Sequence, residues 1–397
     1  MYPSPETPAV PALGGVVPMR VQAIDVVRGL VMVVMALDHV RDFWSPTAFR
    51  PKDLSQTSEL LFFTRWITHF CAPTFVFLSG VSIWLQQQKL KSQSATSRFL
   101  LKRGLWLVLM EVGVISFLLQ WSYSMILLQV IWVIGCGMVL LAALLWLPRL
   151  ALMLLAAFIL VGHNALPSVQ PITAATTGWA LLHNGPFLLS VGLLPPLLVA
   201  YSVGPWLGVM LAGYLLGPWF VRPMSERKKL LRMTGAGMLA VFFSLRFTNW
   251  YGDPTPWSVQ PKGGLYTALS FLNVSKYPPS LLFVCLTLGV SLLLLSRLEA
   301  VDNRLTRWLR TFGQVPFFYF LLHLLVISAG ACLWTHWAFG QAINLAFANP
   351  TAWPKNYEPS LLRAYVVWAV VVLALYWPCS WYRRFKQRNS YWWLAYL

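Results

Sequence analysis

The sequence predicts an all-α integral membrane protein, a polytopic bundle of about ten (10–11) transmembrane helices. Hydrophobic residues make up 58% of the 397 residues and charged residues only 11%, whereas about a quarter of a soluble domain is charged. In addition, apolar segments long enough to cross a ~30 Å hydrocarbon core recur along the whole chain. The predicted spans are 23–44, 60–86, 99–119, 124–147, 149–162, 197–220, 230–247, 279–296, 313–335 and 361–382.

The chain carries a formal net charge of +18, and the positions of its basic residues indicate a membrane topology. With the N-terminus placed in the cytoplasm, two thirds of the 30 lysines and arginines fall in the terminal segments and in the short connections on that side. Cytoplasmic loops of membrane proteins collect basic residues in this way. The sequence therefore predicts two cytoplasmic termini and a lipid bilayer as partner, with no nucleic acid.

The termini and the cysteines complete the domain organisation. Residues 1–19 are Pro-rich and almost uncharged, which predicts a disordered tail. Residues 20–388 form one predicted membrane domain, and 389–397 a C-terminal tail. The five cysteines are scattered through apolar segments without a CxxC or Cys/His pairing, so the sequence predicts no metal site. A homodimer is left open.

The first predicted span is unusual because it carries several ionisable side chains. Such groups are costly at membrane depth and by default mark a functional site. On a helix, residues three or four apart share a face. The residues at this spacing form one stripe along the helix, which consists of Asp25, Arg28, Met32, Met35, His39 and Asp42. Asp38 lies at the edge of this stripe, and Arg41 is expected to point away from it.

The spacing of this stripe predicts a cation and an imidazole at different depths. Arg28 and His39 are eleven residues apart, or roughly 16 Å along a helix axis, about half of the ~30 Å core. The predicted topology puts Arg28 toward the cytoplasm and His39 toward the outer face. The alternative is structural: Asp25 would pair with Arg28 at i,i+3, and His39 would be a satisfied interfacial histidine.

Other polar side chains lie at the ends of later spans. Arg65 and His69 begin the second span at the predicted depth of His39, and could instead be a snorkelling arginine and a structural histidine. Lys102 and Arg103 begin the third span, where a basic flank is also expected from topology alone. Glu111, further along that span, is interpreted as structural.

The last candidates come from two later segments. Lys276 and Tyr277 precede a long apolar run together with two prolines, which indicates a fixed start for the eighth span. His323 falls near mid-membrane in the ninth span, with Tyr319 one turn earlier on the same face. An intramembrane histidine is a functional candidate, although a structural Tyr–His contact explains the pair equally well.

Four segments resemble a known family. Arg28–Gly29, followed by nine residues and then His39, is similar to the first-helix signature of the transmembrane acyltransferase superfamily. The later segments resemble, more narrowly, bacterial relatives of heparan-alpha-glucosaminide N-acetyltransferase. They are RWITHFCAPTFVFLSG (65–80), SKYPPSLLFVCLTLG (275–289) and GQVPFFYFLLH (313–323).

The resemblance implies a membrane enzyme of the bacterial inner membrane that takes acetyl-CoA from the cytoplasm and delivers the acetyl group to a sugar or glycan outside. Arg28 would then hold the donor, and His39 would act where donor and acceptor meet. The family's lysosomal enzyme carries a histidine in the loop after the first helix, whereas residues 45–64 here contain none. His39 or His69 would have to take its place, or the acceptor differs.

The expected roles follow from this chemistry. A hydroxyl or amine needs a general base to attack a thioester, and histidine serves near neutral pH; an acetyl-histidine intermediate is the other route. The expected catalytic residues are His39, Asp38, Asp42 and His69. The expected acyl-CoA contacts are Arg28, Asp25, Lys102 and Arg103. The expected acceptor contacts are Arg65, Lys276, Tyr277, Tyr319 and His323.

Two other functions remain open from the residues. Ionisable stripes and intramembrane histidines also suit a proton-coupled transporter or flippase, although the two halves show no inverted repeat of the kind that such folds often have. A purely structural subunit would leave the polar stripe without a purpose.

Overall fold

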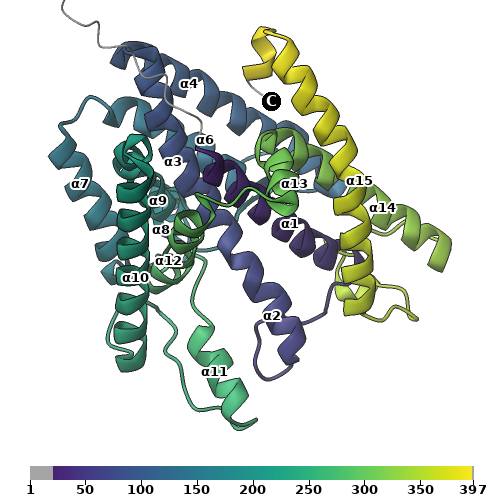
Figure 1. Cartoon of the computed structure of the whole chain (residues 1–397). Coiled ribbons are helices and arrows are strands. Elements are labelled where there is room, and N and C mark those ends of the chain that lie inside the picture. Colours follow the sequence, from purple (N-terminus) through teal and green to yellow (C-terminus); the bar gives the residue numbers. More distant parts are fainter. Residues whose placement is uncertain (1–20, 396–397) are drawn as a thin grey trace, which may run out of the picture.

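The computed structural model describes residues 21–395, so the predicted tail 1–19 and the last two residues of the predicted tail 389–397 lie outside the described part. The described chain is a bundle of helices with three short strands (Figure 1). The first half contains α1 (Gln22–Trp44), α2 (Glu59–Ile67), a 3-10 turn (Thr68–Phe70), α3 (Cys71–Leu90), α4 (Gln93–Leu109), a π-helical turn (Met110–Ile115), α5 (Ser116–Gln120), β1 (Ile126–Leu128), α6 (Val130–Leu144), α7 (Arg149–Ala157), α8 (Thr177–His183), β2 (Phe187–Leu189) and β3 (Leu197–Val199).

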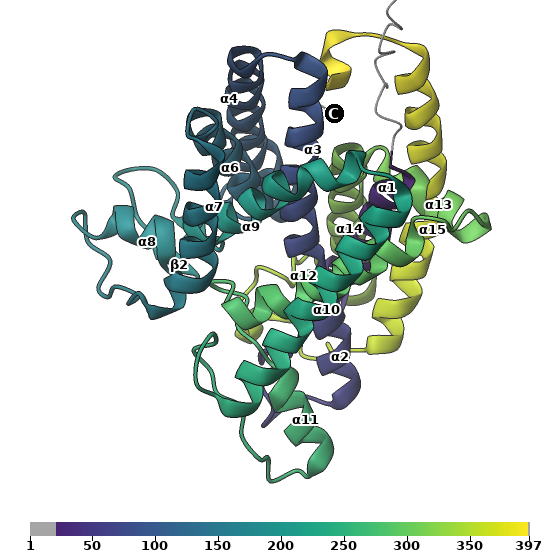
Figure 2. The ribbon, with the colours of Figure 1, turned by 60° about the vertical axis from the view of Figure 1, so that its left-hand side comes forward.

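The second half is helical throughout its regular structure. It contains α9 (Val203–Leu216), α10 (Met224–Thr248), α11 (Gly264–Leu272), α12 (Leu281–Leu298), α13 (Arg304–Gly313), α14 (Pro316–Phe339) and α15 (Leu361–Arg388). The start of α1 and the end of α15 lie toward one end of the bundle, while α2 and α11 lie at the opposite end (Figures 1 and 2).

Each predicted span overlaps a helix, which supports a multi-pass membrane protein. Within residues 21–395, seven helical segments are long and apolar enough to cross a bilayer, and α6 and the segment Arg149–Ala165 are shorter apolar helices. The helix α1 has 23 residues but carries three aspartates and two arginines. The seven segments are Glu59–Leu90, Gln93–Gln120, Val203–Val221, Met224–Thr248, Leu281–Leu298, Pro316–Phe339 and Leu361–Arg388.

Two predicted spans begin in a small sheet instead of a helix. The strand β1 occupies the start of predicted span 124–147, and β3 occupies the start of 197–220. In the sheet, β3 lies between β1, to which it is parallel, and β2, to which it is antiparallel. Because short apolar runs fit strands and buried helices equally well, the pairing partner decides between them.

The helix α1 lies in the centre of the bundle and packs against α3, α12, α13, α14 and α15. Its Gly29 explains the glycine of the Arg-Gly signature. A Cβ atom at Gly29 would lie 1.9 Å from the carbonyl oxygen of Leu309, and one at Gly313 would lie 1.8 Å from that of Asp25. Only glycine lets α1 and α13 approach so closely, as small residues do between membrane helices.

Candidate active site

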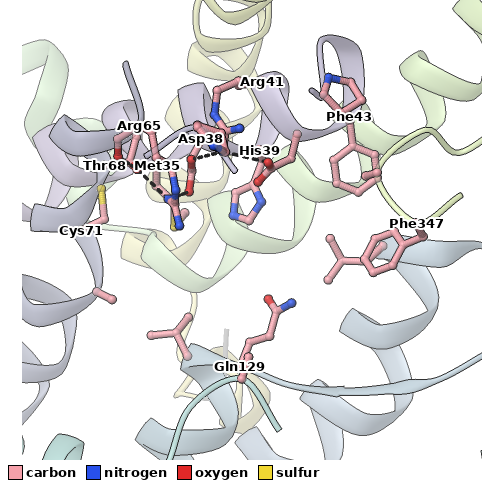
Figure 3. A pocket seen from close by; sticks show the side chains of 18 of the residues that line it. Met35, Asp38, His39, Arg41, Phe43, Arg65, Thr68, Cys71, Gln129 and Phe347 are labelled. Carbon is pink, nitrogen blue, oxygen red and sulfur yellow. Dashed lines mark hydrogen bonds and ion pairs between the residues drawn. The ribbon is translucent and has the colours of Figure 1, made fainter. Parts of the chain in front are cut away.

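The C-terminal half of α1 borders a cavity of about 480 Å³, here called the outer cavity. Figure 3 shows Asp38, His39 and Arg41 on one wall, with Arg65 beside Asp38 and Gln129 on the opposite side. The residues that carry its polar chemistry are Asp38, His39, Arg41, Asp42, Arg65, Thr68, Gln129, Tyr201, Lys276 and Tyr277. Six of these are candidate site residues predicted from the sequence, and Arg41, Thr68, Gln129 and Tyr201 are additions.

A network of ion pairs organises the wall formed by α1. Asp38 accepts hydrogen bonds from Arg65 and from Arg41, whose Nη2 lies 2.9 Å from Oδ1. Arg41 also pairs with Asp42 at 2.8 Å, and Arg65 donates to the Thr68 hydroxyl at 2.9 Å. The contacts of Asp38 and Asp42 described by the structure therefore go to arginines and not to the imidazole of His39.

The prediction that Arg41 points away from the stripe is wrong. Its side chain is buried and lines the outer cavity. The backbone position of residue 41 does face away from the stripe, but the arginine side chain is long enough to turn back onto Asp38 and Asp42. The electrostatic gain of pairing with two carboxylates in a buried setting exceeds the preference set by helical spacing.

His39 points into the outer cavity (Figure 3), and a second histidine supports it from behind. The ring of His323 on α14 meets the ring of His39 edge-on, with centroids 5.1 Å apart. Nδ1 of His323 donates to the backbone carbonyl of Tyr319 at 3.1 Å, so its Nε2 carries the lone pair. Within residues 21–395 that Nε2 has no hydrogen-bond partner.

Tyr319 and His323 thus lie behind the wall and not on it. The Tyr319 ring stacks on His323 with centroids 5.2 Å apart, and both side chains are fully buried. Neither lines the outer cavity. The structure brings His323 into contact with His39, and His39 alone of the three lines the outer cavity.

His69 lies apart from this group. It is buried, its ring packs against Phe283 with centroids 5.6 Å apart, and it borders neither cavity. In the described part of the chain, neither ring nitrogen has a hydrogen-bond partner. The structure therefore favours His39 over His69 as the histidine at the site.

The small sheet brings two polar side chains to the cavity floor. Because β1 and β3 are parallel with Leu128 opposite Val199, their carboxyl ends lie together, and Gln129 and Tyr201 follow them directly. Glu111 accepts a hydrogen bond of 2.9 Å from the backbone N–H of Gln129. This buried carboxylate holds the junction of β1 and α6, as the structural interpretation of Glu111 predicted.

Lys276 and Tyr277 are held in the cavity wall by a buried polar hub. Asp253 accepts hydrogen bonds from the Ser275 N–H at 2.8 Å and from the Ser280 hydroxyl at 2.6 Å. Arg246 lies 3.8 Å from Asp253 and donates to four backbone carbonyls of the same loop region. The hub fixes the segment between the two serines, which carries Lys276 and Tyr277.

The loop between α14 and α15 closes another side of the outer cavity. Its Phe347 packs near Phe43 of α1, with ring centroids 6.1 Å apart (Figure 3). Asn344 donates to the Leu119 carbonyl at 2.7 Å, which ties the loop to α5. Trp353 also lines the cavity. This wall is apolar, with Phe347 and Trp353 as its aromatic side chains.

The N-terminal half of α1 borders a second, smaller cavity of about 330 Å³, here called the inner cavity. Its two ionisable lining residues are Arg28 and Arg103, and most others are apolar. Arg28 donates to the Gly313 carbonyl at 3.2 Å and the Ser82 hydroxyl at 3.1 Å. Asp25 lies 3.5 Å from Arg28 and is buried behind it.

Lys102 is not part of the inner cavity. It is exposed on α4, whereas its neighbour Arg103 lines the cavity wall. Successive residues of a helix point about 100° apart, so only one of the two can face the bundle interior. Among the expected acyl-CoA contacts, the structure therefore groups Arg28, Asp25 and Arg103 and separates Lys102.

The two cavities adjoin at a set of apolar side chains that line both, here called the collar. Four side chains, one from each of four helices, line both cavities. They are Met35 of α1, Phe75 of α3, Val130 of α6 and Phe320 of α14. His39 is one helical turn beyond Met35 on the outer side, and the Phe320 ring touches His323 with centroids 5.4 Å apart. The stripe from Arg28 to Asp42 therefore faces both cavities in succession.

This arrangement suits the transfer of a group between two substrates. A thioester placed at the collar would have a cationic, largely apolar cavity on one side and an imidazole with polar neighbours on the other. Within residues 21–395, no group of three or more His, Cys, Asp and Glu side chains could hold a metal ion.

Comparison with known proteins identifies the family. The model of the family described as heparan-alpha-glucosaminide N-acetyltransferase, catalytic, matches residues 20–245, more than half of the chain. The match includes Arg28, His39 and the collar residues of α1, α3 and α6. No curated protein matches the chain. The chain therefore belongs to the family of heparan-alpha-glucosaminide N-acetyltransferase catalytic domains and is a membrane acyltransferase.

Proposed function

We propose that the protein transfers an acetyl or related acyl group from cytoplasmic acyl-CoA to a sugar or glycan acceptor on the extracytoplasmic side of the bacterial inner membrane. The observation that carries this proposal is the pair of cavities along α1, which meet at the collar one turn before His39. In a two-sided enzyme each substrate needs its own cavity, and the reacting atoms must meet where the cavities do.

The inner cavity is the donor side of the proposal. At about 330 Å³ it is near the lower limit for small-molecule sites, so it would hold the acyl-pantetheine arm while the nucleotide stays at the mouth. The arginines Arg28 and Arg103 would attract the negatively charged donor. Asp25 and the Gly313 carbonyl, which contact Arg28, would keep its guanidinium oriented.

The outer cavity is the acceptor side and supplies the general base. His39 would take the proton from the acceptor hydroxyl or amine as the acceptor oxygen or nitrogen attacks the thioester carbonyl carbon. The carbon–sulfur bond then breaks, and the proton passes from His39 to the departing CoA thiolate. The Gln129 amide, which borders the same cavity, would donate to the thioester oxygen as negative charge develops on it.

The remaining polar groups have supporting roles in this proposal. Asp38 and Asp42 would stabilise the protonated imidazole through their charge, while Arg41 and Arg65 fix both carboxylates in place. The buried His323 would hold the His39 ring at one angle through their edge contact. Arg65, Lys276 and Tyr277 would bind the acceptor together with the aromatic wall.

The basic connections support the proposed sidedness. The loop between α3 and α4, the connection around α13 and the end of α15 are rich in Lys and Arg, as cytoplasmic segments of membrane proteins are. They would put both termini and the inner cavity on the cytoplasmic side, with ten helices crossing the bilayer.

Purified protein in detergent provides the test. Acetyl-CoA labelled in the acetyl group is supplied with a panel of sugars and lipid-linked glycans, and free CoA and labelled product are measured. We expect CoA release that depends on the acceptor and a matching amount of acetylated product. Initial rates are then measured while both substrate concentrations are varied. Parallel lines in double-reciprocal plots would indicate an acetyl-enzyme intermediate, and intersecting lines would indicate direct transfer.

A transporter would give a different result. Two cavities that adjoin at an apolar collar also suit a carrier that moves a solute without covalent chemistry. In that case no acceptor would stimulate thioester cleavage, and proteoliposomes would take up substrate when a proton gradient is imposed. That outcome would overturn the proposed transfer.

A further inference from the structure

We propose that the outer cavity contains a subsite for a negatively charged substituent of the acceptor, a carboxylate or a phosphate, with Lys276 as its central side chain. This inference rests on the proposed acyl transfer and narrows the class of its acceptor. It rests on Lys276, a buried cation in the cavity wall for which residues 21–395 provide no ion-pair partner.

Lys276 is buried in the cavity wall against two tyrosine side chains. The residue is only 7% exposed. Its Nζ atom lies over the ring of Tyr201, 5.5 Å from the centroid, and over that of Tyr277, 5.1 Å from the centroid. Among residues 21–395, Lys276 takes part in no ion pair. One of its donor hydrogens is directed at the Tyr277 hydroxyl, and the others meet the tyrosine ring faces and the open cavity.

The other cations of the cavity differ from Lys276 in this respect. Arg65 pairs with Asp38, and Arg41 pairs with Asp38 and Asp42. The lining thus contains three cationic side chains, Arg41, Arg65 and Lys276, and two carboxylates. The two carboxylates are already engaged, so the surplus positive charge belongs to Lys276.

Such a charge is costly to bury unless something compensates it. Removal of an ammonium from water is penalised strongly, and the faces of two tyrosines compensate it only in part. Lys52, whose Nζ is hydrogen-bonded to the Val274 carbonyl, provides no negative charge to compensate it. An anionic group of the acceptor, entering the cavity beside the tyrosines, would complete the missing ion pair.

The lysine cannot escape this cost by reaching into bulk water. Asp253 fixes the backbone on both sides of it through Ser275 and Ser280. Tyr201 and Tyr277 meet edge-on, with centroids 5.4 Å apart, and form the surface beneath its ammonium group. The site is therefore built to keep a cation in place, and the aromatic walls suit the apolar faces of a sugar ring.

The experiment compares pairs of acceptors in which one sugar carries an anionic group that the other lacks. Glucosamine is compared with glucosamine 6-phosphate, and galactose with galacturonic acid, as acceptors of labelled acetyl groups from acetyl-CoA. For the wild type we expect a KM lower by about tenfold or more for the charged sugar of each pair, as for one charge-assisted hydrogen-bonded pair. Equal KM values, or a preference for the neutral sugars, would overturn the inference.

Variants assign the effect to the lysine. Lys276→Met should raise the KM for the charged sugar about tenfold more than it raises the KM for the neutral sugar, so that the preference for the charged sugar disappears. Lys276→Arg, which keeps the positive charge, should retain most of the preference for the charged sugar over the neutral sugar. Lys262→Met is the matched control, because Lys262 also lies over a tyrosine ring, that of Tyr266 at 4.8 Å, but does not line the cavity. A charge preference that persists in Lys276→Met contradicts the assignment.

A binding measurement separates this inference from the proposed reaction. Thermal unfolding in detergent is recorded with and without glucosamine 6-phosphate for the wild type and both Lys276 variants. Stabilisation by the phosphorylated sugar that requires Lys276 supports the subsite even if no acetyl group is transferred. Acetyl transfer to neutral sugars alone would support the proposed function and reject the subsite.

Discussion

The inner and outer cavities border the same face of α1, yet they differ in almost every other respect. The inner cavity has two ionisable lining residues, both arginines, among mainly apolar side chains. The outer cavity is lined by two carboxylates, three cationic side chains and the imidazole of His39, together with several aromatic side chains. A single amphipathic stripe therefore serves two environments, one suited to holding a long charged donor and the other to moving a proton. The collar marks the boundary between them.

The largest effect should come from removal of the imidazole of the outer cavity. If His39 is the general base, His39→Ala should lower kcat for acetyl transfer by about 10²–10⁴-fold, with little change in the affinity for acetyl-CoA. Steady-state kinetics with varied donor and acceptor would measure both quantities. His69→Phe is the control, because the buried ring of His69 borders neither cavity and lies against Phe283; it should retain most of the activity. Full activity in His39→Ala would remove the base from the proposed mechanism.

A second effect should be confined to the inner cavity. Arg28→Met removes a cation that contacts Gly313 and Ser82, and should weaken acetyl-CoA binding by about 10–100-fold, as for loss of a charge-assisted contact. Arg103→Met should act in the same direction. Lys102→Met should leave donor binding unchanged, since Lys102 is exposed outside the cavity. Donor affinity can be measured by equilibrium binding of labelled acetyl-CoA. Equal losses in Lys102→Met and Arg103→Met would show that only the overall basic charge matters.

Variants of the collar test whether its side chains seal the outer cavity from the inner cavity. Phe320→Ala shortens a collar side chain that lines both cavities, whereas Phe317→Ala enlarges only the inner cavity. Narrow apolar constrictions exclude water and ions when nothing occupies them. We therefore expect proteoliposomes with Phe320→Ala to leak protons several-fold faster than those with the wild type or with Phe317→Ala, measured with a trapped pH-sensitive dye. Equal leak rates for all three proteins would mean that another region provides the seal.

The same comparison explains which features the sequence could predict. The face from Arg28 to Asp42 follows from helical spacing alone, and each predicted span overlaps a helix because apolar length is a strong local signal. The residues that face α1 across the outer cavity are not marked by any local pattern in the sequence. Gln129 and Tyr201 reach the outer cavity only because two short parallel strands pair over a long sequence separation. The side-chain direction of Arg41 depends on Asp38 and Asp42, and not on its own helical position.

The smallest expected effect concerns pH and lies at the margin of the outer cavity. Burial, together with repulsion from Arg65 and Lys276, lowers the pKa of Lys52 to about 7, whereas an unfolded chain has a lysine pKa near ~10.4. Between these values the unfolded state binds a proton that the folded state does not, so the free energy of unfolding should rise with pH from about 7 to about 10. Below pH 7 both states are protonated, and this dependence disappears. Lys52→Met should remove this contribution, so its thermal unfolding midpoint in detergent should rise less between pH 7 and pH 9 than that of the wild type. An equal rise in both proteins would indicate that Lys52 stays protonated in the fold, which would add a second unpaired cation beside Lys276.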